Sequence, residues 1–151
     1  MKRRDFIKAA STGAIATSGA LAAPAIHARG RRVRWKMVTT WPRNFPGMGT
    51  GANHLARLIN EMSGGRIEVK VYGAGELVPA FGIFDAVSRG VAEMGHGASY
   101  YWKGKSEAAQ FFSAVPFGLT AQEMNGWLYH GGGMELWRKI YADFGLEPTA
   151  A

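Results

Sequence analysis

The fold of this chain is decided by residues 33–72, which read VRWKMVTTWPRNFPGMGTGANHLARLINEMSGGRIEVKVY. Apolar and polar residues alternate in residues 33–40 and again in residues 67–72, and a period of two predicts a strand at each place. Between them, four apolar residues recur at helical spacing: Leu55, Leu58, Ile59 and Met62. This spacing predicts a helix over residues 52–62, with Thr50 as its N-cap. A strand, a helix and a strand in this order indicate a right-handed β-α-β unit with parallel strands.

Further elements are predicted on the C-terminal side of this unit. A helix is expected over residues 81–89, and a third strand over residues 91–98. Another helical stretch starts at Ser106, and the three strands with their intervening helices indicate an α/β fold with a parallel sheet. Since a mean sheet has about five or six strands, we interpret this as an incomplete α/β domain.

Two helices are predicted in the last third of the chain. Thr120 and Glu123 have the spacing of a capping box, in which each residue satisfies a backbone N–H group at the helix start. A final helix has its apolar residues between Leu136 and Phe144, and Gly145 is expected to end it.

Residues 1–28 have the features of a twin-arginine export signal. Arg3 and Arg4 open a basic region, and the apolar stretch that follows is diluted by Ser, Thr and Gly. Small residues close the segment, so we expect cleavage after Ala25 or Ala28. The sequence therefore predicts export to the periplasm by the twin-arginine route.

The charge of the chain lies mostly at its N-terminal end. The formal net charge is +7, but from residue 37 onward acidic residues outnumber basic ones by one. A nucleic-acid-binding domain would spread basic residues over a face, so we expect no nucleic-acid partner. The chain has no cysteine, which excludes disulfides and thiol chemistry.

Motifs for catalysis and cofactor binding are weak. Residues 47–52 fit a dinucleotide-binding pattern of glycines, but residues 41–46 separate it from the preceding strand, where the first glycine should lie. No two histidines beyond the signal have metal-ligand spacing, so no metal site is expected. No acid–base pair stands out either, and no catalytic residue is predicted.

Aromatic residues follow two of the predicted strands. Trp41 and Phe45 come after the first strand, and Tyr100, Tyr101 and Trp102 come after the third. Both places fall at the carboxyl edge of a parallel sheet, where ligand sites of α/β folds form. Aromatic side walls with tyrosine hydroxyls would suit a small organic acid. The alternative is that these rings pack at the rim of the core.

Four segments together carry a resemblance to a known family. Residues 34–42, 75–87, 92–105 and 115–123 resemble, in order, the substrate-binding proteins of TRAP transporters, which are tripartite ATP-independent periplasmic uptake systems. The sequence is most similar to the subfamily that captures 2-oxo monocarboxylates such as pyruvate.

The resemblance implies a two-lobed receptor that closes on its ligand and delivers it to a membrane permease driven by a sodium gradient. Residues 29–151 would be part of the first lobe, like a periplasmic-binding-protein lobe without its second lobe. The family's carboxylate-binding arginine lies on a later strand, so we expect weak binding by this chain alone. The resemblance also implies no cofactor except sodium or another cation in the full-length form, which can be a homodimer.

One wall of the ligand site can be carried over from the family. It comprises Phe45, Tyr100 and Tyr101, and we extend it to Trp41 and Trp102. Three alternatives stay open at this point: a secreted enzyme acting on a small organic acid, a domain that binds another protein through its aromatic face, and a non-functional remnant of a receptor.

Overall fold

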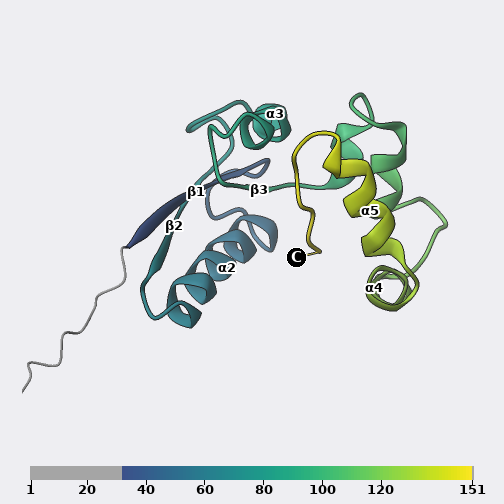
Figure 1. Cartoon of the computed structure of the whole chain (residues 1–151), viewed down its shortest axis with the longest axis horizontal. Helices are drawn as coiled ribbons and strands as arrows, with labels where there is room; N and C mark the ends of the chain where they lie inside the picture. The colour runs from purple at the N-terminus through teal and green to yellow at the C-terminus, as the bar shows by residue number, and fades with distance from the viewer. Residues whose placement is uncertain (1–31, 151) are drawn as a thin grey trace, which may run out of the picture. The chain divides into compact units, whose positions relative to one another are not determined.

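The structure is a computed structural model that describes residues 32–150. The predicted export signal, residues 1–28, lies outside the described residues. Within the described part of the chain, the elements comprise a parallel sheet with helices packed on it (Figure 1). The α/β class predicted from the sequence is confirmed.

The sheet has three parallel strands in the order β2-β1-β3. Strand β1 spans Val33–Thr39, β2 spans Ile67–Tyr72 and β3 spans Met94–His96. The parallel pairing of β1 with β2 confirms the predicted β-α-β order. Because β1 is central, the loops that follow β1 and β3 start side by side at the carboxyl edge.

Strand β3 is shorter than the predicted strand over residues 91–98. At its start, the backbone N–H of Lys36 donates to the carboxylate of Glu93 at 2.7 Å instead of to a carbonyl of β3. The Lys36 ammonium in turn donates to the carbonyl of Val91. Side-chain bonds thus replace the strand ladder before Met94, and the prediction was too long at both ends.

Helix α2 spans Met48–Met62 and begins earlier than predicted. Thr50 is not its N-cap: the cap residue is Gly47, whose φ of 78° lets the chain turn into the helix. The Thr50 hydroxyl instead donates to the Gly47 carbonyl inside the first turn. The early start is possible because Gly49 lies against the loop, where a Cβ would be 2.7 Å from the Pro42 carbonyl oxygen.

The remaining elements follow the predicted order. The capping box is present, since Thr120 N donates to the Glu123 carboxylate at 2.8 Å, and this bond lowers the pKa of Glu123. The stretch predicted from Ser106 is a 3-10 helix rather than an α-helix. The bounds are η1 Ala80–Gly82, α3 Ile83–Ser88, η2 Ser99–Trp102, η3 Glu107–Phe112, α4 Ala121–His130 and α5 Gly133–Ala142.

One hydrophobic core joins the sheet to the C-terminal helices. Its largest members are aromatic: Phe84, Trp102, Phe112, Trp137 and Tyr141. Helix α2 lies along β2 and β1, α3 lies beside β3, and α5 packs on η3 and α4 (Figure 1). No helix of residues 32–150 is long and apolar enough to cross a membrane.

Candidate functional site

The carboxyl edge of the sheet holds the backbone around Trp41 in place. The amide of Ala74, just after β2, donates to the Trp41 carbonyl at 2.8 Å, and the Thr39 hydroxyl donates to the same oxygen at 2.8 Å. The amide of Thr40 donates to the carbonyl of His96 at 3.1 Å. The chain leaving β1 is therefore tied to the ends of both neighbouring strands.

Four aromatic side chains gather at this edge and form the aromatic cluster: Trp41, Phe81, Tyr100 and Tyr101. Tyr101 is at its centre, with ring centroids 4.5 Å from Tyr100, 5.1 Å from Phe81 and 6.0 Å from Trp41. Tyr100 and Phe81 are 40% and 68% exposed. The cluster thus has a central, partly buried ring held by its neighbours and two rings that face solvent.

The hydroxyl of Tyr101 is set up as a hydrogen-bond donor. The hydroxyl of Tyr100 beside it is the main cause that raises the pKa of Tyr101 above its ordinary value of 10.0, and burial adds to this. A phenolic O–H group is a hydrogen-bond donor, so the hydroxyl of Tyr101 can donate to an anionic or carbonyl oxygen.

The five predicted site residues lie in three different environments. Trp41, Tyr100 and Tyr101 come together in the aromatic cluster. Phe45 is 48% exposed on the loop before α2, and no ring pair among residues 32–150 includes it. Trp102 is only 6% exposed and packs on Phe84 at 5.5 Å, so it belongs to the core behind the cluster.

Two functional candidates were missed in the sequence: Phe81 and His96. Periodicity assigned Phe81 to a helix, although it lies in one of the segments that carry the family resemblance. His96 accepts a hydrogen bond on Nδ1 from Trp41 Nε1 at 2.8 Å. No local sequence signal links His96 to Trp41, because the two residues are 55 positions apart.

Two cations near the aromatic cluster, Arg43 and Lys105, are paired with carboxylates. Arg43, two residues after Trp41, donates from Nε to Glu76 at 2.7 Å and also from Nη2, which lowers the pKa of Glu76. Lys105 bonds Asp85 at 2.8 Å. Both ion pairs are solvent-exposed, so each stabilises its loop only slightly, and neither Arg43 nor Lys105 is an unpaired counter-charge for a ligand carboxylate.

A cation site is not built by the described residues. In residues 32–150 there is no group of three or more His, Asp or Glu side chains placed to hold a metal ion.

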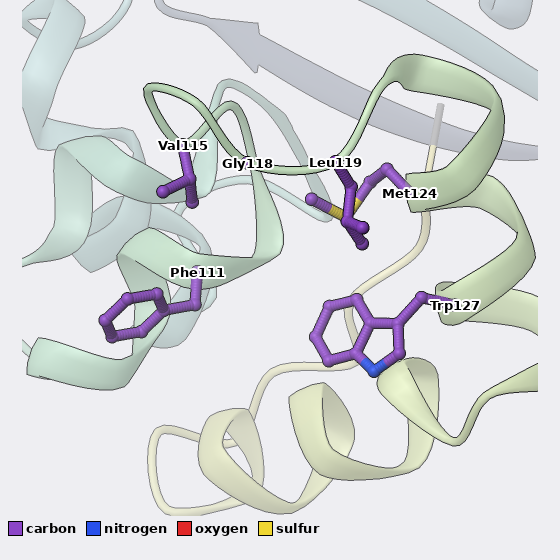
Figure 2. Close-up of a pocket in the computed structure, with 6 residues that line it drawn as sticks. All are labelled: Phe111, Val115, Gly118, Leu119, Met124 and Trp127. Carbon is purple, nitrogen blue, oxygen red and sulfur yellow. The ribbon is translucent and has the colours of Figure 1, made fainter.

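A separate hollow of about 230 Å³ lies between η3 and α4. Its lining is Phe111, Val115, Gly118, Leu119, Met124 and Trp127. Figure 2 shows that these side chains are hydrocarbon and thioether, apart from the indole nitrogen of Trp127. Such a surface offers a carboxylate almost no hydrogen bonds, so this hollow is not a site for an organic anion.

Two glycines of α2 give a matched test of how the Trp41–Phe45 loop is held. Gly49→Ala is expected to destabilise the chain by about 1–3 kcal/mol, because the new methyl group would meet the Pro42 carbonyl. Gly51→Ala, two residues further along α2, where a Cβ would have nothing within 4 Å, is expected to stabilise the chain by about 0.5–1 kcal/mol. Urea unfolding measures the free energy of unfolding of both variants. Equal changes in the two would show that close packing of Gly49 does not hold the Trp41–Phe45 loop.

Comparison with known proteins places the chain in a family. The family described as bacterial extracellular solute-binding protein, family 7, matches residues 37–147. The chain belongs to this family. The match includes the ends of β1 and β3, after which residues of the aromatic cluster lie, and the predicted membership of the TRAP receptor family is confirmed.

Three proteins similar to this chain are described as receptors for small carboxylates or were solved with one bound. A monocarboxylate 2-oxoacid-binding periplasmic protein of Nostoc sp. is 41% identical over 150 residues. A solved TRAP periplasmic solute-binding protein of Pseudoalteromonas atlantica, with bound sodium and pyruvate, is 45% identical with a TM-score of 0.74. Another from Colwellia psychrerythraea, with bound calcium and pyruvate, is 44% identical with a TM-score of 0.75.

The chain corresponds to only a part of each relative. The match covers 97% of this chain but 41% of the Nostoc protein. For the solved structures it covers 76% and 78% of this chain, and 35% and 36% of theirs. Since the family consists of solute-binding proteins, the alternative of a secreted enzyme is not supported.

Proposed function

We propose that this chain is part of the receptor of a TRAP transporter that captures a small 2-oxo monocarboxylate such as pyruvate. Residues 29–151 are part of the first lobe, and residues 1–28 are the export signal that brings the receptor to the periplasm. The observation that carries the proposal is the 45% identity with a receptor solved with bound pyruvate. In the full-length form the receptor would deliver its ligand to the membrane permease, and it can form a homodimer.

The ligand-binding wall in this proposal is the aromatic cluster together with Phe45. Pyruvate has a methyl group, a carbonyl oxygen and a carboxylate, so it needs an apolar surface beside hydrogen-bond donors. The rings of Trp41 and Phe81 supply the apolar surface, and the hydroxyls of Tyr100 and Tyr101 supply the donors. Trp102 supports the wall from the core.

The charge that would neutralise the carboxylate is not supplied by this wall. Arg43 and Lys105 are bound to Glu76 and Asp85. Hydrogen bonds to a charged group contribute about 1.5–3 kcal/mol each, so a wall whose Arg43 and Lys105 are already paired holds a carboxylate weakly. We therefore expect the 151-residue chain alone to show no saturable binding of pyruvate below millimolar concentrations.

A chimera tests the function directly. Residues 32–150 of this chain would replace the matching region of the Pseudoalteromonas atlantica receptor, which supplies the rest of the two-lobed fold. Calorimetry is expected to show saturable pyruvate binding, and acetate, which lacks the 2-oxo group, serves as the control ligand. A folded chimera that ignores pyruvate while the parent receptor binds it would overturn the proposed specificity.

The export route gives an independent prediction. In a fusion of residues 1–28 to a reporter protein, the double change Arg3→Lys and Arg4→Lys is expected to abolish export, since the twin-arginine route requires the arginine pair. Lys8→Gln changes a basic residue outside the pair and should leave export unchanged. Fractionation of cells measures the result, and continued export of the double variant would argue for another route.

A further inference from the structure

Trp41 and His96 are joined by a hydrogen bond that only one form of the histidine can make. Trp41 Nε1 lies 2.8 Å from His96 Nδ1, and the two rings meet edge-on at 73°. An indole N–H group can only donate, so His96 Nδ1 must be unprotonated to accept it. The imidazole is therefore neutral and carries its proton on Nε2.

This bond orients the ring of Trp41, whereas the sheet orients its backbone. Thr39 is in register with His96, and the Trp41 carbonyl is held by Ala74. These contacts leave the indole free to rotate about its side-chain torsions. The bond to His96 then selects the orientation in which the indole packs on Tyr101 at 6.0 Å.

We propose that His96 is a positioning residue of the aromatic cluster: its neutral ring holds Trp41 against Tyr101, and protonation of His96 releases Trp41. The effect on ligand binding rests on the proposed function. The coupling between His96 and Trp41 does not, because it can be measured without ligand.

The surroundings of His96 favour its neutral form. Burial alone lowers the pKa of His96 below 6.5. The elements packed around His96 carry the tyrosines Tyr100 and Tyr101 of η2, Lys36 of β1, Glu93 just before β3, Arg89 at the end of α3, and two ion pairs, Asp85 with Lys105 and Arg43 with Glu76. The lowered pKa of His96 has burial as its cause and no contribution from these charges.

The sign of the pH effect follows from this lowered pKa. Between the lowered pKa and 6.5, the unfolded chain binds a proton at His96 that the folded chain does not. The contribution of the neutral histidine to stability is therefore complete above pH 6.5, and it is lost as the pH falls through the folded-state pKa. Trp41 is expected to be held at neutral pH and released in acid.

The test uses the full 151-residue chain labelled with ¹⁵N. Nuclear magnetic resonance between pH 8 and pH 4 is expected to show His96 as the Nε2–H tautomer and a protected Trp41 indole N–H. Trp41→Phe assigns the indole signal. Both signals should change with one shared midpoint below pH 6.5. A Trp41 signal that ignores the titration of His96, or an Nδ1–H tautomer, would overturn the proposal.

Substitutions separate the hydrogen bond from the titration. His96→Asn keeps an acceptor that does not titrate, so protection of the Trp41 indole should remain and its change with pH should vanish. His96→Leu should lose the protection at every pH. His130→Asn, at an exposed histidine of α4, is the control and should behave as the parent chain. If His96→Asn keeps the acid transition, the titrating group is not His96.

The chimera with the Pseudoalteromonas receptor extends the test to ligand. Pyruvate affinity is expected to fall about five- to tenfold between pH 7 and pH 5, the size of one lost hydrogen bond, and to stay flat in the His96→Asn version. A chimera without pyruvate binding but with coupled His96 and Trp41 signals would reject the proposed function alone. Pyruvate binding with equal pH dependence in both versions would reject the role of His96 alone.

Discussion

Tyr101→Ala in the chimera is expected to raise the dissociation constant for pyruvate by about 100-fold, which corresponds to about 2.7 kcal/mol. Tyr101 is the central ring of the aromatic cluster and contacts Tyr100, Phe81 and Trp41. Its loss removes a hydroxyl donor to a charged ligand, worth about 1.5–3 kcal/mol, and the ring that keeps the others in place. Calorimetry with pyruvate at pH 7 gives the dissociation constant.

Two further variants make this result specific. Tyr101→Phe keeps the ring and removes only the hydroxyl. Its rise in the dissociation constant should therefore show the part of the loss that comes from the hydrogen bond. Tyr129→Ala is the matched control, because Tyr129 is 57% exposed on α4, outside the cluster. We expect less than a twofold change there. Equal effects of Tyr101→Ala and Tyr129→Ala would show that the aromatic cluster is not the ligand wall.

Trp137→Ala is expected to lower the free energy of unfolding of the chain by about 3–5 kcal/mol. Trp137 is only 9% exposed, stacks on Phe112 at 5.3 Å with an interplanar angle of 7°, and meets Tyr141 edge-on at 5.7 Å. Its removal would leave a cavity between α5 and η3, where the core cannot close without moving a helix. Because domains are stable by only about 5–15 kcal/mol, this variant could lose most of its folded state.

The adjacent residue provides the control for this core variant. Leu136 is 52% exposed, so Leu136→Ala should change the free energy of unfolding by less than about 0.5 kcal/mol. Urea unfolding followed by circular dichroism at 222 nm measures both variants. A loss at Leu136 as large as that at Trp137 would contradict the assignment of the core.

The sequence predicted the sheet well because strand signals are local. The strands expected over residues 33–40 and 67–72 match β1 and β2 almost to the residue. In β2 burial alternates along the strand, whereas the last three residues of the central strand β1 are all buried, so both of its faces meet the core there. The capping box at Thr120 was equally visible, because both of its partners lie within one turn. The third strand was predicted too long, because the backbone N–H of Lys36 donates to the Glu93 side chain and not to a strand carbonyl.

The site could be predicted only in part. Placing aromatic residues after β1 and β3 was enough to bring Trp41, Tyr100 and Tyr101 together, since parallel strands end at one edge. The same reasoning could not separate Trp102, which turns into the core, from Tyr101, which lies in the cluster. In a 3-10 helix, neighbouring side chains point in different directions, and burial decides which of them packs inside.

By itself, the sequence determined the α/β class, the parallel β-α-β unit, the order of the helices and the likeness to TRAP receptors. These depend on periodicity, capping and matched segments, which are properties of neighbouring residues. Only the tertiary structure decided that α2 begins at Met48, that Phe81 joins the aromatic cluster, and that His96 holds Trp41. Each of these needs contact between groups that different elements of the fold bring together, and such contacts exist only once the chain is packed.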